Sequence, residues 1–268
     1  MSRACRITGV TRSRCYYKSR KDDSGLIAAL QQLAESYPSY GFRKCFAMLR
    51  RQGRPDNRKR VYRVYRLLNL NLRRRKGKRR LPERVRQPLE QQSAINKVWA
   101  LDFMSDSLAC GARVRTLNLM DEGSREGLAI EAASSIGSHR AIRMLERAIE
   151  ARGAKPEALR SDNGPEFTSL AFTQWCKDKE ITQIFIQKGK PMQNGYMERF
   201  NGSFRKDVLD MYLFTERWQV QERANNWLKH YNTERPHEGL NNQTPSEWAN
   251  QNALKTTKSN NNLYFRTV

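Results

Sequence analysis

The 268-residue sequence lacks the signatures of several protein classes. Its five cysteines include no CxxC pair and its three histidines are scattered, which argues against a structural zinc site or a disulfide framework. Free thiols of this kind are typical of a reducing compartment. No apolar run approaches the length of a membrane span, and residues 2–20 lack the apolar centre of a signal peptide. We therefore expect a soluble cytoplasmic protein with no membrane partner.

Acidic residues are scarce in the first third of the chain. Residues 1–96 contain 26 Lys and Arg against 6 Asp and Glu, whereas residues 97–268 contain 24 against 21. A segregated positive excess of this size is the electrostatic footprint of a protein that binds a polyanion, and nucleic acid is the favoured one. The alternative is a disordered solubilising tail. Helical periodicity through much of the region favours nucleic-acid binding.

Three short amphipathic helices are predicted within residues 1–70. They cover residues 26–34, ending before Pro38, then residues 42–51 and residues 58–68. Their apolar residues recur on one side, and in the second and third helices Arg and Lys lie on the other. We interpret the region as a small basic all-α unit of helix-turn-helix type that binds DNA. A structural three-helix bundle with a merely solvated basic face would have the same fold.

A basic linker is predicted at residues 71–96. The stretch from Arg73 to Arg80 has seven basic residues in eight, and such a block repels itself and should be extended until it lies along phosphates. Pro82 and Pro88 also favour a linker. The predicted DNA contacts of this arm are Arg73, Arg74, Arg75 and Lys76.

The rest of the chain is predicted to form an α/β core, at residues 97–214, followed by a helical extension and tail at 215–268. Strand patterns cover residues 98–104, 114–120, 127–132, 158–161 and 181–186. Helical patterns cover residues 138–152, a segment capped by Thr168, the segment around Glu198, a segment from 215 to Tyr231, and a short helix opened by a capping box at 244–247. Three strands, helix, strand, helix, strand, helix is the order of a ribonuclease-H-like fold. We therefore expect a five-stranded mixed sheet flanked by helices.

Two acidic residues in this core have constrained surroundings. Asp162 follows an apolar strand and precedes an Asn-Gly-Pro turn signal, so it should lie where that strand ends. Glu198 lies on a predicted helix, off its apolar stripe, and 35 residues (163–197) separate it from Asp162. The predicted buried face of this helix consists of Met197, Phe200, Phe204, Val208 and Met211. A carboxylate at a strand end and another on a helix can therefore point at one space.

A third acidic residue, Asp102, interrupts an apolar run of strand length. An unpaired aspartate buried in such a strand would cost several kcal/mol, about 2–7 kcal/mol even for a neutral polar group. A divalent cation shared with Asp162 and Glu198 would neutralise it. Taken singly, an aspartate before Asn-Gly is commonly a turn former, and a glutamate on a helix is commonly solvated. Glu166 is the nearest rival acid, and we expect it to support the loop after Asp162.

The combination of motifs resembles a known family. The segments W-x-x-D-F at 99–103, S-D-N-G-P-E-F at 161–167 and K-G-K-P-x-Q-N-G-Y-x-E-R-F-N-G at 188–202 are similar to those of the DDE transposases of bacterial insertion sequences. These share the retroviral-integrase catalytic core, although this chain lacks the N-terminal His/Cys zinc module of retroviral integrases. The chain is most similar to products of the second of two overlapping reading frames, and the resemblance extends from about Leu26 to Trp248.

The resemblance implies that Asp102, Asp162 and Glu198 are catalytic and hold metal ions. Two Mg²⁺ ions per site are expected, with Mn²⁺ as a substitute, because the ligands are hard carboxylate oxygens. Asp102 and Asp162 would bind one ion, and Asp102 with Glu198 the other. The expected activity is metal-dependent cleavage and strand transfer at insertion-sequence ends.

DNA is the expected partner, both as terminal repeats and as target. Beyond the basic arm, the candidate contacts are Lys188, Lys190, Gln193, Asn194, Arg199 and Arg205. The resemblance also implies a homo-oligomer on DNA, in the bacterial cytoplasm at the nucleoid. Because the helical region begins abruptly at Met1, an upstream-frame protein or a fusion to it is a further expected partner.

Two other functions compete with the enzyme. The chain could be a DNA-binding regulatory product of the element, inactive without the upstream-frame domain. Ribonuclease H proper would share the fold but not the basic first third or the segment at 188–195. The segment from Asn232 to His237 is interpreted as structural, because two-metal chemistry needs no histidine base.

Overall fold

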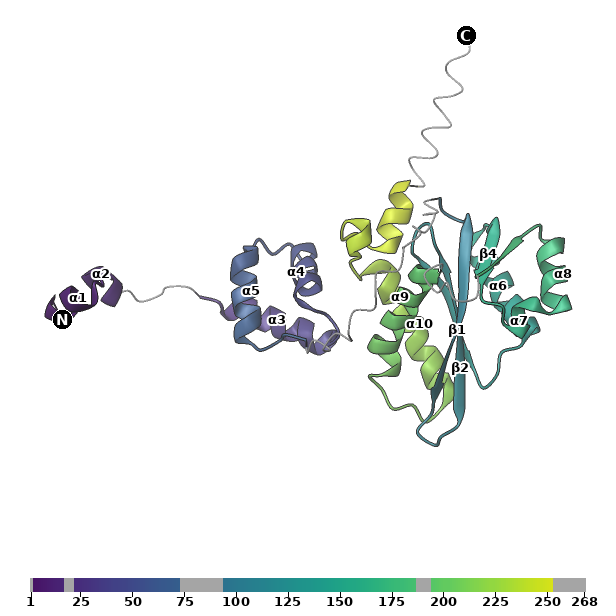
Figure 1. Cartoon of the computed structure of the whole chain (residues 1–268), viewed down its shortest axis with the longest axis horizontal. Helices are drawn as coiled ribbons and strands as arrows, with labels where there is room; N and C mark the ends of the chain where they lie inside the picture. The colour runs from purple at the N-terminus through teal and green to yellow at the C-terminus, as the bar shows by residue number, and fades with distance from the viewer. Residues whose placement is uncertain (1, 17–21, 73–93, 187–193, 253–268) are drawn as a thin grey trace, which may run out of the picture. The chain divides into compact units, whose positions relative to one another are not determined.

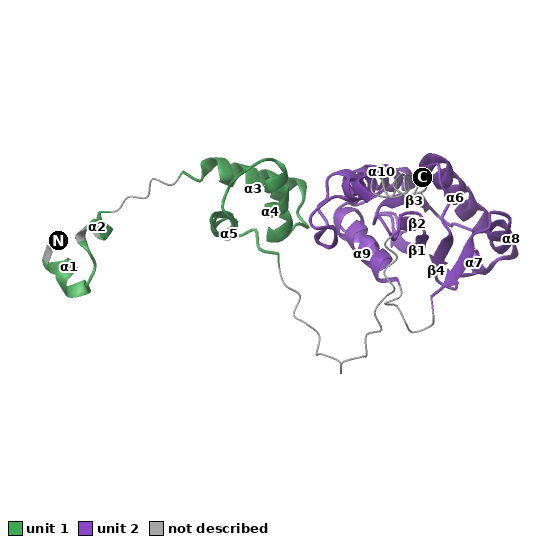
Figure 2. Cartoon of the chain, turned by 90° about the horizontal axis from the view of Figure 1, so that it is seen from above, with its two compact units in different colours: residues 1–73 green, residues 74–268 purple. Residues whose placement is uncertain are grey.

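The computed structural model of the chain describes residues 2–16, 22–72, 94–186 and 194–252. The chain divides into two compact units, residues 1–73 and residues 74–268 (Figure 2). In the described part of the chain, no helix is long and apolar enough to cross a membrane.

The first unit is all helical, as predicted. Its helices are α1 (Ser2–Thr8), α2 (Arg12–Cys15), α3 (Ser24–Ser36), α4 (Phe42–Arg51) and α5 (Arg58–Leu67). The last three bury one apolar cluster, which includes Leu30, Leu49 and Val64. Asp23, just before α3, accepts hydrogen bonds from Arg60 Nε at 2.9 Å and Arg63 Nη2 at 2.6 Å on α5. These ion pairs join the first and last helices of the cluster and lower the pKa of Asp23.

The second unit contains the predicted five-stranded mixed sheet. Its strands are β1 (Val98–Ser107), β2 (Arg113–Asp121), β3 (Gly127–Ala133), β4 (Ala158–Ser161) and β5 (Thr182–Phe185). They lie in the order β3-β2-β1-β4-β5. The first three pair antiparallel, and β4 lies parallel to β1 and β5. This is the ribonuclease-H-like arrangement expected from the order of elements.

Helices cover both faces of the sheet (Figure 1). On one face lie α6 (Ser138–Arg152), α7 (Pro165–Thr168) and α8 (Leu170–Asp178). On the other lie α9 (Gly195–Phe204), its π-helical continuation η2 (Arg205–Leu209) and α10 (Arg217–Thr233). The chain continues through the 3₁₀ turn η3 (Glu238–Leu240) and a helix at residues 245–252.

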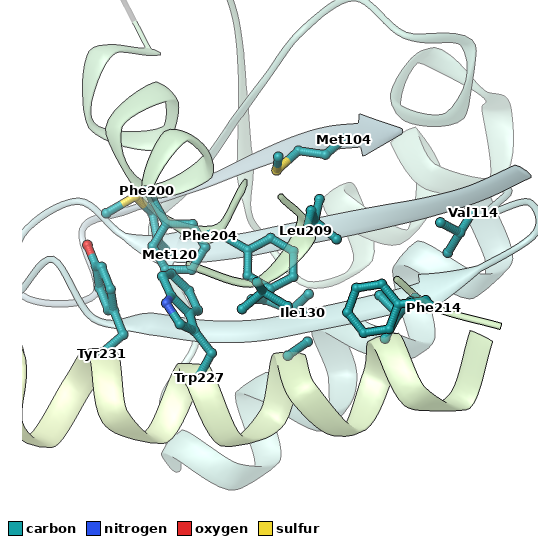
Figure 3. Close-up of a cluster of buried hydrophobic side chains, with 14 of the residues drawn as sticks. Met104, Val114, Met120, Ile130, Phe200, Phe204, Leu209, Phe214, Trp227 and Tyr231 are labelled. Carbon is teal, nitrogen blue, oxygen red and sulfur yellow. The ribbon is translucent and has the colours of Figure 1, made fainter. Parts of the chain in front are cut away.

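Successive side chains of β1 point to opposite faces of the sheet and pack in two separate hydrophobic cores. Trp99 and Leu101 pack with α6 and α8, whereas Ala100 and Met104 pack with α9 and α10. In the second core, aromatic rings of α9 and α10 pack against one another (Figure 3). The Phe200 ring centroid lies 5.2 Å from that of Trp227, in an edge-on arrangement. Because Asp102 follows the same alternation as Ala100, it belongs to the face covered by α9.

Several predicted boundaries are confirmed. The helix α6 ends at Gly153, which adopts φ 65° as a left-handed cap. The predicted capping box is also present, since Thr244 Oγ1 accepts from Glu247 N at 3.2 Å and Glu247 Oε2 accepts from Thr244 N at 2.9 Å. These local signals determine the boundaries because all their hydrogen-bond partners lie within a few residues.

Two side-chain predictions were wrong. Met211 was placed on the buried face of the Glu198 helix, but its side chain is 41% exposed. The chain forms a π-turn at η2, which shifts the register of the apolar stripe so that Leu209 is buried instead. The cap of α8 is Ser169 rather than Thr168, because Ser169 Oγ accepts from Phe172 N at 3.3 Å and Thr168 ends α7.

Side-chain amides of α10 close the exposed edge of β3. Gln221 Oε1 accepts from Ala132 N and Gln221 Nε2 donates to Ile130 O, both at 2.7 Å. Asn232 pairs in the same way with both backbone groups of Gly127, at 2.9 and 2.8 Å. These bonds occupy groups of an edge strand that could otherwise pair with another chain.

Replacement of Gln221 by leucine is expected to lower the free energy of unfolding by about 1–2 kcal/mol, because two backbone groups of β3 lose their partners. Urea unfolding followed by fluorescence measures this loss. Asn226→Ala, which removes an amide from the exposed side of the same helix, is the matched control and should change stability by less than about 0.5 kcal/mol. Equal losses of unfolding free energy in the two variants would show that the hydrogen bonds between Gln221 and β3 contribute nothing to stability.

Candidate active site

Two of the predicted acids lie side by side on neighbouring strands. β1 and β4 are parallel, with Ala100 opposite Arg160, so Asp102 and Asp162 come two residues further along each strand and on the same face. Asp162 follows the last residue of β4 and is exposed. Its Oδ1 accepts from Gly164 N at 3.0 Å, which forms the turn predicted at the strand end.

Asp102 is half-buried and held by two donors. Its Oδ1 accepts from Phe103 N at 2.9 Å, and its Oδ2 accepts from Asn201 Nδ2 of α9 at 2.8 Å. The carboxylate therefore faces α9, as the alternation along β1 requires.

Glu198 lies in the first turn of α9 and is exposed. It precedes Asn201 by three residues, so the two side chains share one side of the helix, and Asn201 contacts Asp102. The pKa of Asp102 is raised to about 6, chiefly by burial and further by the negative charges of Asp162 and Glu198. Three carboxylates from a strand, a strand end and a helix thus share one electrostatic environment.

The donor set fits a divalent cation in its chemistry. All three groups are carboxylates, which hard ions such as Mg²⁺ prefer. A half-buried carboxylate whose ionisation is opposed by two like charges is also a site that a cation would neutralise. Across the ranges that the structure describes, no three His, Cys, Asp or Glu side chains are gathered tightly enough to hold a metal as they stand. The carboxylates would have to turn toward one another to share an ion.

Glu166, the rival acid, is engaged elsewhere. Its Oε1 accepts from Arg115 Nη1 of β2 at 2.7 Å, and the Arg115 guanidinium lies 4.1 Å from the centre of the Phe103 ring. A side chain at Gly164 would place its Cβ 3.0 Å from Asp162 Oδ1 and 3.1 Å from Glu166 Oε2. Glu166 therefore braces the loop after Asp162 against β2, in keeping with the role expected for it.

The sequence is similar to those of known protein families. The sequence matches the family described as integrase core domain over residues 92–191, another family of the same description over residues 179–245, and the HTH-like domain family over residues 20–79. It is 40% identical over 249 residues to the insertion element IS407 uncharacterized 31.7 kDa protein of Burkholderia multivorans, a match covering 92% of this chain and 89% of that protein. The chain belongs to the insertion-sequence transposase family.

More distant proteins also match this transposase. It is 24% identical over 252 residues to transposase InsD for insertion element IS2A/D/F/H/I/K of Escherichia coli, over 89% of this chain and 83% of that one. The HTLV-2 integrase catalytic core domain in complex with magnesium has a TM-score of 0.46 and 22% identity, over 57% of this chain and 95% of that one. The family matches confirm the resemblance seen in the motifs, with DNA as the general partner of an HTH-like unit and an integrase core.

The predicted DNA contacts of the transposase have different placements. Arg199 is exposed beside Glu198 on α9. Arg205 is half-exposed and braces the end of β1, donating to Asp106 Oδ2 at 3.2 Å and Ser105 O at 2.9 Å. The contacts that lie outside the described residues are Arg73, Arg74, Arg75, Lys76, Lys188, Lys190 and Gln193.

The burial of Asn194 argues against the prediction that its side chain contacts DNA. Asn194 is only 6% exposed, and its Oδ1 has no hydrogen-bond partner among the described residues. It directly precedes α9, where the chain turns into the core. A side chain buried there presents no surface to DNA, so Asn194 is not retained as a contact.

Two asparagines of the transposase site were not recognised from the sequence. Asn118 is fully buried in β2, opposite Asp102, and it donates to Asn201 Oδ1 at 2.7 Å. An asparagine in the middle of the apolar run of β2 was the available signal, because buried amides need hydrogen-bond partners.

Within the segment from Asn232 to His237, Arg235 and Pro236 are buried, whereas Thr233 and Glu234 are exposed. The Arg235 guanidinium is buried and forms an ion pair with Asp207 of η2, whose Oδ2 also accepts from Trp227 Nε1 at 3.0 Å. The His237 ring packs edge-on against Tyr231, with centroids 4.7 Å apart. These contacts connect the end of α10 to the π-turn that follows α9.

Proposed function

We propose that this transposase cleaves phosphodiester bonds at the ends of its insertion sequence and joins the cut strands to target DNA. The observation that carries the proposal is that Asp102 and Asp162 extend from neighbouring parallel strands on the face covered by α9, the helix that carries Glu198. The charges of Asp162 and Glu198 add to burial in raising the pKa of Asp102, which supports an electrostatic coupling of the three acids.

Asp102, Asp162 and Glu198 would hold two divalent ions, for which Mg²⁺ is the favoured metal. Cores of the integrase type depend on divalent metals; when bound, such ions supply an activated oxygen nucleophile and stabilise an alkoxide leaving group. The protein supplies the placement. Phe103 N of β1 and Asn201 of α9 hold Asp102, and the turn at Gly164 holds Asp162. Hydrolysis at the element's end would release a 3′-hydroxyl, which would then attack a second phosphodiester.

The proposed DNA-binding surfaces are the helical unit, the basic arm at residues 73–76 and the segment that leads into α9. Arg199 is exposed and follows Glu198 on α9, and its guanidinium is included among the proposed phosphate contacts. A homo-oligomer on DNA and an upstream-frame partner remain part of the proposal.

The test is cleavage and joining of a supercoiled plasmid that carries both ends of the element. Nicks with 3′-hydroxyl termini at the element's ends are expected with Mg²⁺ or Mn²⁺, and no product is expected with EDTA. A plasmid without the ends is the control for contaminating nucleases and should stay intact. DNA binding without cleavage in either metal, with the upstream-frame product added, would overturn the proposal in favour of a regulatory DNA-binding protein.

A further inference from the structure

A buried asparagine lies behind the half-buried acid. Asn118 occupies the position on β2 directly opposite Asp102 on β1. Its side chain is completely buried between the sheet and α9, and it lies between Leu117 and Leu119 in the sequence. An amide at such a position is unfavourable unless hydrogen bonds compensate for its lost hydration.

The hydrogen bonds of Asn118 form a directed chain. Asn118 Nδ2 donates to Asn201 Oδ1 at 2.7 Å, and Asn201 Nδ2 donates to Asp102 Oδ2 at 2.8 Å. A carboxylate can only accept, so Asn201 must turn its NH₂ group toward Asp102 and its oxygen toward Asn118. Asn118 must then present its own NH₂ group. The ionised acid therefore fixes the direction of the chain.

The chain leaves one polar atom unsatisfied at its far end. Asn118 Oδ1 is buried and has no hydrogen-bond partner among the described residues. If the amides only served to attach α9 to the sheet, an apolar side chain in place of Asn118 would remove this unfavourable atom. A buried unsatisfied group calls for an explanation, and a functional role for its side chain is one such explanation.

We propose that Asn118 is a positioning residue that acts through Asn201 to hold the Asp102 carboxylate ready for a metal ion. Phe103 N fixes Oδ1 and Asn201 fixes Oδ2, so the plane of the carboxylate is set by donors from two elements. The remaining lone pairs of the two Asp102 carboxylate oxygens are available to bind a cation. The inference rests on the proposed function, because it assigns a purpose to the orientation of a proposed ligand.

The test is Mn²⁺ binding by the full-length protein without DNA, measured by calorimetry or by the relaxation of water protons. Asn118→Leu should weaken Mn²⁺ binding about tenfold to a hundredfold, as loss of a partner behind a metal ligand does elsewhere. Its stability toward urea should change little, because removal of the unsatisfied Asn118 oxygen offsets the loss of the hydrogen bond to Asn201 Oδ1. Asn118→Asp should weaken binding as well, since its carboxylate would attract the NH₂ group of Asn201 away from Asp102.

Two further variants separate positioning from packing. Thr116→Val is the matched control, because Thr116 lies on the same face of β2, is buried, and also has an unsatisfied oxygen among the described residues; it should leave Mn²⁺ binding unchanged. In an Asn201→Ala background, Asn118→Leu should have no additional effect on binding, because the route through Asn201 is already broken.

The outcomes distinguish the two proposals. Equal Mn²⁺ binding by the wild type and Asn118→Leu overturns the positioning role and leaves the proposed function intact. A loss of stability that matches the loss of binding also overturns it, since the role would then be structural. A wild type that neither binds Mn²⁺ nor cleaves DNA overturns the proposed function, and the positioning role with it.

Discussion

Replacement of Asp102 by asparagine should abolish metal-dependent strand cleavage and, in the absence of metal, should make the protein more stable at neutral pH. The loss of activity follows from removing the carboxylate that the other two acids flank. A ligand that supplies about 4 kcal/mol of transition-state stabilisation corresponds to a rate loss of about a thousandfold. The gain in stability follows because, without a metal ion, the Asp102 carboxylate is half-buried and repelled by the charges of Asp162 and Glu198.

The sign of the stability effect comes from the pKa of Asp102. Burial, followed by the charges of Asp162 and Glu198, raises this pKa to about 6, whereas an unfolded aspartate titrates at about 3.9. The folded protein therefore binds the proton more tightly than the unfolded chain. The stabilising effect of that proton is present below pH 4 and is lost as the pH rises to about 6. At pH 7.5 the ionised carboxylate should cost on the order of 2 kcal/mol, after allowance for solvent screening of a half-buried group.

The measurement compares unfolding of the wild type and Asp102→Asn in EDTA at pH 4 and pH 7.5, together with plasmid cleavage in Mg²⁺. The variant should be more stable at pH 7.5 and nearly equal to the wild type at pH 4. Asp106→Asn is the matched control on the same strand and face; Asp106 pairs with Arg205, so this variant should keep activity and gain no stability. Wild-type cleavage by Asp102→Asn would remove Asp102 from the catalytic set, and lower stability at pH 7.5 would contradict the electrostatic account.

Much of the fold could be predicted because its signals are local. The helix from Ser138 to Arg152 and the strand from Ala158 to Ser161 begin and end where apolar periodicity and a glycine cap placed them. The five-stranded mixed sheet followed from the sequence of elements, since few topologies accommodate three strands followed by alternating helices and strands. Asp102 could be identified because a charge in an apolar strand violates the pattern around it.

The remaining features depend on contacts between distant residues, which no local pattern contains. Asn118 and Asn201 are 83 positions apart, and Glu122 and Arg160 are 38 apart. Met211 was misplaced because a π-turn inserts one extra residue into the helical repeat. Asn194 looked like a loop residue, but the packing of the start of α9 buries it. Each of these outcomes was decided by tertiary packing.

Replacement of Arg160 by methionine should lower the free energy of unfolding of the second unit by about 3–5 kcal/mol. Arg160 Nη1 donates to both carboxylate oxygens of Glu122 at 2.8 Å, and the two side chains are 11% and 2% exposed. Without the guanidinium, the Glu122 carboxylate would be left ionised in the interior. Total stabilities are about 5–15 kcal/mol, so the loss would be a large fraction of the whole.

All five tryptophans lie beyond residue 97, so urea unfolding followed by tryptophan fluorescence reports on this unit. Arg147→Met is the control: Arg147 pairs with Glu131 at 2.7 Å, but its side chain is 64% exposed. The loss of unfolding free energy in Arg147→Met should be below about 1 kcal/mol, because solvent screens a surface ion pair. The Arg160–Glu122 and Arg147–Glu131 distances are similar. A difference between the two variants in the loss of unfolding free energy would therefore measure the effect of burial.

The pH dependence and a double variant identify the cause of the loss at Arg160. Burial already raises the pKa of Glu122 in spite of Arg160, and removal of Arg160 should raise it further. A folded pKa above the unfolded one gives stability at low pH that is lost as the pH rises, so Arg160→Met should be closer to the wild type at pH 5 than at pH 8. Glu122→Met combined with Arg160→Met should recover most of the stability, since neither charge of this buried pair remains. A double variant as unstable as Arg160→Met would show instead that the arginine stabilises the unit through the packing of its side chain on β4.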